Sequence, residues 1–319
     1  MIIKLLKIIF SISIIYYLVK NNILEFSNIH NLINNPVPII LCACTFIFST
    51  IICSFRWRML IVNNSNSKDT IPRLLSIKLT WVGLFFNTVL PGAITGDIIK
   101  FYYIKKEKPN MKQSYLFNSV LLDRIIGLAG LLILSSIFCI INYNELVKKS
   151  IMIEQVLHLS FLLTAIAIIG FTILVFSQEH KKFFLDLTLK VPFFHNKLFH
   201  FCEQLFQISA CKKTLVYSLI ISIVAHTANV LGFWVLTSPF FENHISLINI
   251  FAFTPLGLLT TALPIAPAGM GVGHAAFSYL FSFLNNSNGA SLFNLFFLAT
   301  ISNNLLGVIP YLGIKKKNK

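Results

Sequence analysis

Charged side chains inside apolar stretches are rare in this chain, and they are the first candidates for chemistry. Asp123 and Arg124 lie about ten residues into an apolar run that starts near residue 114. A charge inside a bilayer costs about 2.5–3.5 kcal/mol on insertion scales, so such residues are functional candidates by default. Adjacent helix residues point about 100 degrees apart, so each of the two needs a partner elsewhere, and Asp97 is the natural counter-charge for Arg124. Two interpretations stay open: a charged site that binds or gates a phosphate-bearing head group, and a structural ion pair that holds the hairpin to the bundle.

A cluster of polar residues and helix breakers precedes this pair. Glycines let a backbone approach a ligand closely, and Asn or Thr side chains satisfy freed amides. A half-helix that starts after Gly96 would present N–H groups suited to phosphate, and Asp97 is also a candidate N-cap for the segment 98–104. We expect these residues to line a substrate path, together with the Asp123–Arg124 pair: Asn87, Pro91, Gly92, Gly96, Asp97 and Lys100.

A second run of breakers occurs near the other end of the chain. Its candidate path residues are Pro264, Pro267, Gly269, Gly271, Gly273 and His274. A protonated His274 at the start of a returning half-helix could bind an anion, although a lone histidine beside glycines is more often structural. His226, within an apolar run, is expected to be a hydrogen-bonded packing histidine.

The residues Phe55-Arg56-Trp57-Arg58 close another apolar run. Arginine and aromatic side chains at the end of a span are typically interfacial anchors, so Arg56, Trp57 and Arg58 are predicted to lie at the level of the lipid head groups. A specific phosphate-binding role for them is the alternative.

The sequence carries no recognisable catalytic or cofactor motif. Walker A, HExxH and GxSxG patterns are absent, and the GMGVG run has no preceding strand. The six cysteines form no CxxC pair, and packing in apolar spans explains them better than disulfides or a metal. We therefore expect no enzymatic activity, no metal site and no cofactor.

Composition identifies an integral membrane protein. Of 319 residues 56% are hydrophobic and 12% charged, with a mean hydropathy of +0.77, whereas soluble domains contain about 25% charged residues. The net charge of +15 does not indicate nucleic acid as a partner. Basic residues lie between apolar runs, where the positive-inside rule and anionic lipids account for them.

The elements that must position these residues are helices. Six full spans are predicted at about 4–20, 37–55, 114–142, 157–176, 214–238 and 291–314. The segments 74–96 and 246–284 are predicted to be broken, re-entrant hairpins, since basic clusters flank the first on both sides and prolines and glycines interrupt the second. Two short spans, 246–263 and 270–284, are the alternative for the second. The expected fold is an all-α polytopic membrane protein with one domain, residues 1–319.

The distribution of lysines and arginines predicts the orientation of the chain in the membrane. With both termini in the cytoplasm, most of the 26 basic residues fall on the cytoplasmic side. The order span, span, hairpin, span then recurs in opposite orientation in the halves 1–150 and 151–319, which is the inverted repeat of many transporters. The longest cytoplasmic loop, 177–213, is predicted to be either an amphipathic helix on the inner leaflet or a plain basic connector.

Taken together, the motifs resemble the lysylphosphatidylglycerol synthase transmembrane family, also called the flippase-like domain family. Order and spacing agree over residues 1–314 at four places: Phe55-Arg56-Trp57; Gly83 to Asn87 leading to Leu90-Pro91-Gly92 and Gly96-Asp97 with Lys100; Asp123-Arg124 with Gly127; and Pro264 to Gly273. The resemblance implies an eight-segment bundle with broken helices that moves lipids, such as aminoacylated phosphatidylglycerol, between leaflets.

Two positions depart from the family pattern. Thr95 stands where the family commonly has a second glycine, and His274 stands where it commonly has an acidic residue, which weakens a proton-coupled or cation-recognising role for that position. The long synthases also carry a soluble aminoacyl-transfer domain after the membrane part. Because this chain stops at Lys319, we expect it not to synthesise lysyl-lipid.

The leading hypothesis is a multi-pass protein of the bacterial cytoplasmic membrane that translocates a polar or phosphate-bearing lipid without ATP hydrolysis. Its partners would be membrane lipids, anionic or modified phospholipids, and a lipid-modifying enzyme. Two alternatives stay open: a secondary transporter of a small polar solute, and a non-transporting membrane partner of a lipid- or glycan-modifying enzyme that acts through the 177–213 loop.

Overall fold

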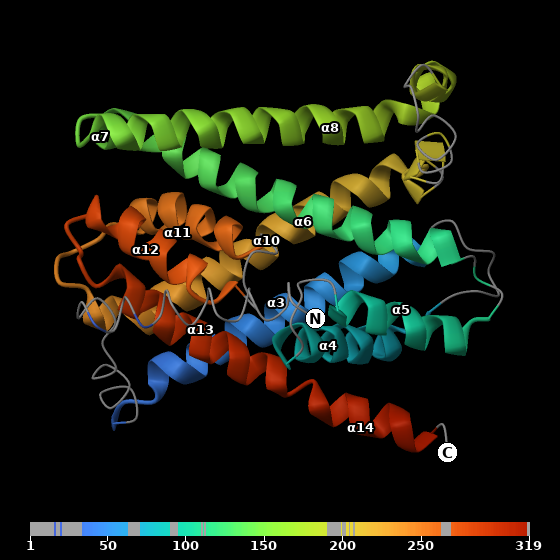
Figure 1. Cartoon of the computed structure of the whole chain (residues 1–319), viewed down its shortest axis with the longest axis horizontal. Helices are drawn as coiled ribbons and strands as arrows, with labels where there is room; N and C mark the ends of the chain where they lie inside the picture. The colour runs from blue at the N-terminus through green and yellow to red at the C-terminus, as the bar shows by residue number, and fades with distance from the viewer. Residues whose placement is uncertain are drawn as a thin grey trace.

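The structure is a computed structural model whose described part is entirely helical. It describes residues 16, 20, 34–62, 71–89, 95–109, 111, 113–189, 199, 202–203, 205–206, 208–262 and 269–317. The elements are α3 (Val37–Val62), α4 (Arg73–Val89), α5 (Thr95–Glu107), α6 (Gln113–Ile141), α7 (Tyr143–Val147), α8 (Ile151–Leu189), α10 (Lys212–Thr237), η2 (Ser238–Phe240), α11 (Leu247–Thr261), α12 (Val272–Ser282), α13 (Gly289–Leu305) and α14 (Val308–Lys317) (Figure 1).

Five stretches of the described chain are long and apolar enough to cross a membrane: Val37–Val62, Gln113–Ile141, Ile151–Phe176, Lys212–Phe240 and Gly289–Ile314. They correspond to five of the six predicted spans, and the protein is a multi-pass membrane protein. The sixth predicted span, 4–20, lies outside the described residues except for Tyr16 and Lys20.

Of the two alternatives predicted for 177–213, a helix is found as far as residue 189, continuous with the preceding span and not separate from it, and its place on the inner leaflet stays a prediction. Helix α8 continues from its apolar part to Leu189 without interruption. The charged residues after position 178 mark the place where the helix leaves its apolar stretch, and a helix with its backbone hydrogen bonds satisfied internally does not need to end there.

Each of the two segments predicted to be a hairpin contains a pair of short helices, and re-entry of either pair from one side of the membrane stays a prediction. Helix α4 packs against α5, and α11 packs against α12. The residues between the paired helices, 90–94 and 263–268, lie outside the described residues, and with them the predicted path residues Pro91, Gly92, Pro264 and Pro267.

The bounds of the hairpins differ from the prediction. The returning limb of the first pair runs to Glu107, well past residue 96, and contains the segment 98–104 that was predicted to follow Gly96. Pro255 lies inside α11 and does not end it. With 15 and 11 residues, α11 and α12 are about 23 and 17 Å long, too short to cross a hydrocarbon core of about 30 Å separately, which favours a hairpin over two spans.

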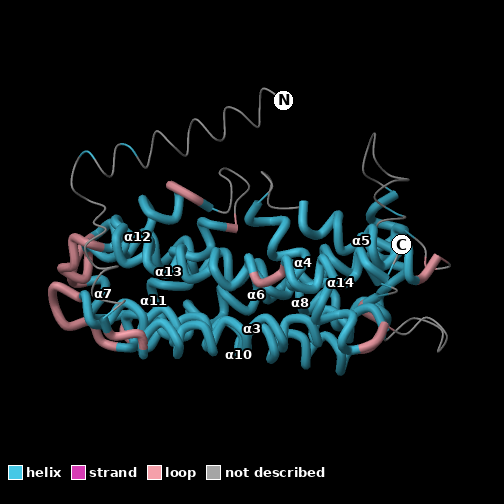
Figure 2. The backbone as a smooth tube through the Cα atoms, turned by 90° about the horizontal axis from the view of Figure 1, so that it is seen from below, coloured by secondary structure: helices cyan, strands magenta, loops and turns pink. Residues whose placement is uncertain are grey.

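The two hairpins lie toward opposite ends of the bundle. In Figure 1 the pair α4–α5 lies toward the end that holds the C-terminus, whereas α11 and α12 lie at the other end. Figure 2 shows α3 and α10, which pack along one another, on one side of the bundle, with α12 and α13 on the other. This arrangement is the one that an inverted order of elements predicts, and a repeat relationship between the halves stays a prediction.

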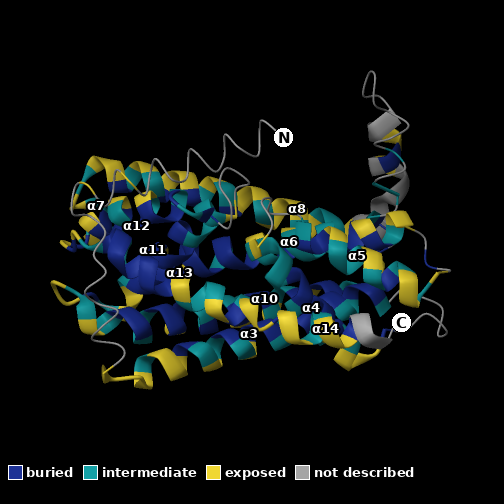
Figure 3. Ribbon diagram, turned by 60° about the horizontal axis from the view of Figure 1, so that its bottom comes forward, coloured by how far each residue is buried: buried dark blue, intermediate teal, exposed yellow. Residues whose placement is uncertain are grey.

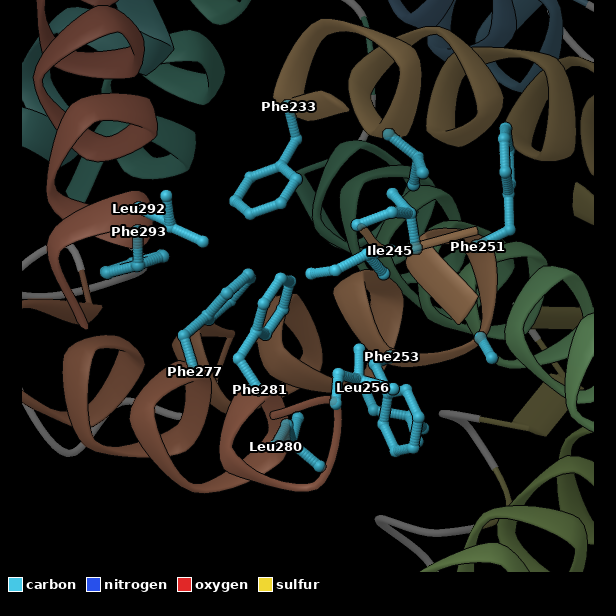
Figure 4. Packing of buried hydrophobic residues seen from close by; sticks show 14 of the residues in the cluster. Phe233, Ile245, Phe251, Phe253, Leu256, Phe277, Leu280, Phe281, Leu292 and Phe293 are labelled. Atoms are coloured by element: carbon cyan, nitrogen blue, oxygen red, sulfur yellow. The ribbon is translucent and has the colours of Figure 1, made fainter. Parts of the chain in front are cut away.

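Aromatic packing forms the largest core. Phe233 of α10 contacts Phe277 and Phe281 of α12, with ring centroids 5.3 and 5.7 Å apart, and Phe293 of α13 lies 4.7 Å from Phe277 (Figure 4). Buried residues fill the interior while exposed ones lie along the outer helix faces (Figure 3). Many of the exposed residues are large and apolar, as a lipid-facing surface requires.

Candidate functional site: a charged cluster at the first hairpin

Helices α4 and α5 cross with their backbones in direct contact. A Cβ atom built on Gly96 would overlap the carbonyl group of Gly83, so only glycine fits at this crossing. The Gly96 N–H donates to Asn87 Oδ1 over 2.7 Å, and Thr95 Oγ1 donates to the Phe86 carbonyl over 3.3 Å. Asn87 and Gly96 therefore hold the hairpin together and bring the first turn of α5 against the end of α4.

Asp97 projects from this first turn into a group of cations. Its Oδ2 accepts from Arg124 Nε at 2.5 Å and also lies 2.5 Å from Arg124 Nη2, while Lys100 Nζ lies 3.7 Å from Oδ1. The predicted pairing of Asp97 with Arg124 is confirmed. The predicted N-cap role is wrong, because α5 begins at Thr95 and Asp97 lies within the helix.

Lys100 ties the hairpin to α3. Its aliphatic chain lies across Gly83, where an added Cβ would come within 2.7 Å of Lys100 Cε. Its ammonium group lies 4.8 Å from the ring centroid of Trp57, within the range of a cation–π interaction. The absence of a side chain at Gly83 thus lets a lysine run back over the hairpin toward an aromatic ring.

A second ion pair lies in the interior, between α3, α6 and α10. Arg56 Nε donates to Asp123 Oδ1 over 2.7 Å, and Arg56 Nη1 donates to Ser222 Oγ over 2.9 Å. The guanidinium group lies over Gly127, whose carbonyl is 2.9 Å from His226 Nε2. His226 is hydrogen-bonded as predicted, and the neighbours Asp123 and Arg124 reach different partners, as their divergence on the helix requires.

Arg56 and Trp57 are buried between helices, and their predicted position at the level of the lipid head groups stays a prediction. Arg56 is only 6% exposed, and Trp57 is buried beneath Lys100. Helix α3 continues past them to Val62 and packs these residues against α6 and α10. Arg58 donates from Nε to the Ile71 carbonyl over 2.6 Å and holds the chain that enters α4.

The cluster carries a net positive charge. Its ion pairs join three cations, Arg56, Lys100 and Arg124, to two carboxylates, Asp97 and Asp123. Exposure is uneven, since the side chain of Arg124 is 37% exposed and that of Asp97 only 11%. The group that a ligand would meet first is therefore a guanidinium, which suits phosphate because it offers paired donors in a plane.

The second hairpin presents a different environment at its predicted site. His274 is buried, its Nδ1 accepts from the Gly271 N–H over 3.3 Å, and Nε2 lies 3.3 Å from Asn294 Oδ1. Because Nδ1 accepts, the proton is on Nε2 and the ring is neutral. The ring centroid of Phe293 lies 4.8 Å away, edge to face. His274 is thus placed as a packing residue, and an anion-binding role has no support from its surroundings.

The glycines of the second hairpin serve its geometry. Gly269 and Gly271 have φ values of 74 and 81 degrees, which favour glycine, and a Cβ on Gly273 would collide with the ring of Phe293. Ser222 is the residue of the buried ion-pair network that the sequence did not reveal, since a single serine in an apolar helix carries no distinguishing signal.

Comparison with known families matches this architecture to one of them. A family model described as the lysylphosphatidylglycerol synthase TM region matches residues 4–307. The chain belongs to this family. Comparisons with curated proteins and with solved structures found no match. The family match covers nearly the whole chain, including both hairpins and all three cations of the charged cluster.

Proposed function

We propose that the protein moves a phosphate-bearing lipid between the leaflets of the bacterial cytoplasmic membrane, without catalysing a covalent reaction and without hydrolysing nucleotide. Membership of a family named for a phospholipid supports a lipid as the substrate. The observation that carries the proposal is the position of Arg124, a partly exposed cation within an apolar span and beside the broken end of a hairpin.

The ion pair of Asp97 and Arg124 supplies a mechanism for transient binding. A phosphate oxygen can replace the Asp97 carboxylate on the guanidinium, with Lys100 on the other carboxylate oxygen as a second cation. The head group then exchanges one set of charge-assisted hydrogen bonds for another instead of losing its hydration without compensation. The acyl chains meanwhile stay against the apolar outer faces of the bundle.

Charge also supports the orientation of the site. The end of the bundle that holds the C-terminus carries Lys105 and Lys106 at the end of α5 and Lys212 and Lys213 at the start of α10 (Figure 1). By the positive-inside rule this end faces the cytoplasm, so the first hairpin enters from the cytoplasmic side.

Reconstitution in vesicles tests the function. Vesicles that contain trace acyl-labelled fluorescent phosphatidylglycerol are treated with dithionite, which bleaches only the outer leaflet. We expect protein-free vesicles to lose about half of the fluorescence and vesicles with the protein to lose nearly all of it.

Variants connect the movement to the charged cluster. Arg124→Gln should slow it about tenfold or more, because a hydrogen bond to a charged group contributes about 1.5–3 kcal/mol. Lys148→Gln, in the turn after α7, is the matched control and should be unchanged. Wild-type vesicles that bleach no further than protein-free vesicles would contradict the proposal, and uptake of a polar solute by the same vesicles would point to a solute transporter instead.

A further inference from the structure

We infer that Lys100 takes over the carboxylate of Asp97 when a lipid phosphate takes Arg124, so that Asp97 stays paired and the movement of the lipid needs no proton. This role rests on the exchange at Arg124 that is proposed above, and it assigns a task to the second cation beside Asp97. Lys100 is thereby a positioning residue, which acts on the carboxylate and does not have to touch the substrate.

The two oxygens of the Asp97 carboxylate face two different cations. Its Oδ2 is bound by Arg124 of α6, whereas its Oδ1 lies 3.7 Å from Lys100 Nζ, one turn further along α5. The side chains of Asp97 and Lys100 are 11% and 12% exposed, so water screens little of either charge. A hydrogen bond between an ammonium group and a carboxylate is about 2.7–2.9 Å long, so Lys100 would have to move by only about 1 Å to form one.

Two contacts keep the ammonium group of Lys100 at this distance. The aliphatic part of the side chain lies across Gly83, where an added Cβ would come within 2.7 Å of Lys100 Cε and 3.1 Å of its Cγ. The Nζ atom lies 4.8 Å from the ring centroid of Trp57, which is itself buried. A cation–π contact is weaker than an ion pair that is shielded from water. Lys100 therefore has a resting position on the ring and a stronger partner within reach.

The other ionisable side chains on the helices around Asp97 have partners of their own or lie further along their helices. They are Asp123 with Arg56, His226 on the Gly127 carbonyl, Arg58 on the Ile71 carbonyl, the thiol of Cys53, Arg73 and Lys78 in the first two turns of α4, and Tyr102, Tyr103, Lys105, Lys106 and Glu107 further along α5. Among the residues that the structure describes, Lys100 is therefore the cation placed to replace Arg124 without a rearrangement of the helices.

A carboxylate that loses its cation away from water has two ways to avoid the cost of an unpaired charge. It binds another cation, or it takes up a proton, because an apolar environment favours the neutral form of a carboxyl group. With Lys100 in place the first way is open, and Asp97 stays ionised while Arg124 holds the phosphate. Without Lys100 only the second way is left, so each exchange at Arg124 would require a proton from the solvent.

The pH dependence of lipid movement tests this role. Vesicles with one buffer on both sides carry short-chain labelled phosphatidylglycerol, and albumin, which replaces the acid-labile dithionite, extracts the lipid of the outer leaflet. Rates are measured between about pH 5.5 and 8, where histidine is the side chain that ordinarily titrates. We expect the wild-type rate to stay constant across this range. Lys100→Gln should be about tenfold or more slower at the alkaline end, because a charge-assisted hydrogen bond is lost. Its rate should rise on acidification by up to about tenfold per pH unit, as the protonated fraction of Asp97 does.

Further variants assign the proton to Asp97 and separate this role from a role in folding. Asp97→Asn added to Lys100→Gln should abolish the pH dependence, since an amide takes up no proton. Lys100→Arg keeps a cation and should keep the constant profile. Lys106→Gln, at an exposed position on the same helix, is the matched control and should behave as wild type. Each profile is divided by the rate of the same variant at the alkaline end, so a smaller amount of folded protein does not change its shape.

The outcomes distinguish this role from the proposed function. If no lipid moves with the wild-type protein, both are overturned. If lipid moves and Lys100→Gln has a flat profile, whether fast or slow, lipid movement stands and the role of Lys100 is wrong. The same holds if the wild type itself accelerates on acidification and Asp97→Asn removes that acceleration, because Asp97 would then take up a proton with Lys100 present. A pH dependence that persists in the double variant, or that Lys106→Gln shares, would also overturn the role of Lys100.

Discussion

The two hairpins are similar in size but are held in the bundle by different interactions. The first, α4–α5, adds ionic contacts to its apolar packing: Asp97 binds Arg124 of α6, and Lys100 lies over the ring of Trp57 of α3. The second, α11–α12, is bound through aromatic rings, with Phe277 between Phe233 and Phe293. Ionic contacts can be exchanged for those of a charged ligand, whereas interlocked rings cannot, which is why we propose the first hairpin as the binding element.

Both hairpins nevertheless depend on glycine. Between helices in lipid, burial of apolar surface gains little, so close approach must supply the packing energy. The first hairpin achieves this where Gly96 meets the backbone of Gly83, and the second where Gly257 meets the ring of Phe277. A backbone neighbour cannot give way, but a ring can shift, and this difference predicts unequal tolerance to substitution.

The largest effect is expected for Gly96→Ala. The added methyl group overlaps the Gly83 carbonyl, so α4 and α5 must separate, which should cost about 3 kcal/mol or more of unfolding free energy. Unfolding by SDS in mixed micelles measures the change. Gly170→Ala is the matched control, since nothing lies within 4 Å of a Cβ there, and equal behaviour of the two variants would contradict the close crossing.

Phe277→Ala should have the next largest effect, about 2 kcal/mol in the same titration. Phenylalanine deletions in water-soluble cores cost about 3–5 kcal/mol, and the value is lower here because the unfolded helix in lipid also hides the ring from water. The rate of lipid movement should fall no further than the loss of folded protein accounts for. Tyr279→Ala, on the exposed face of the same helix, is the control and should lose less stability.

Asp97→Asn should cost less, about 1–2 kcal/mol. Breaking a buried ion pair costs about 3–5 kcal/mol, but water screens part of the charge of Arg124, which is 37% exposed. The matched control is Asp186→Asn, an exposed carboxylate near the end of α8. If Asp97→Asn destabilised the protein more than Phe277→Ala, the contrast drawn between the hairpins would be reversed.

Two single-cysteine variants should change stability least. They test whether the two hairpins enter the membrane from opposite sides. With the native cysteines replaced by alanine, Lys106→Cys and Ser287→Cys place exposed thiols at the outer ends of the two hairpins. An impermeant maleimide should label Ser287→Cys from outside intact cells and Lys106→Cys only after the membrane is opened. Labelling of both from the same side would rule out the inverted arrangement.

How much of this could be predicted from the sequence varied with the residue. The partner of Arg124 followed from a count of charges in apolar runs, because few such charges exist and each needs compensation. The burial of Arg56 was not predicted, because its partners Asp123 and Ser222 come from distant parts of the chain. A helical segment after Gly96 was predicted, but the place of Lys100 over Gly83 and Trp57 was not, because contacts between distant parts of the chain leave no pattern in one sequence.

The last span links the two hairpins mechanically. At its start Gly289 lies against the Phe277 carbonyl of α12, and at Gly307 it lies against the Trp81 carbonyl of α4. Neither contact has room for compression, since each brings backbone against backbone. Both hairpins therefore rest on the backbone of the same last span, so a displacement of either one along it would press on the element that the other contacts.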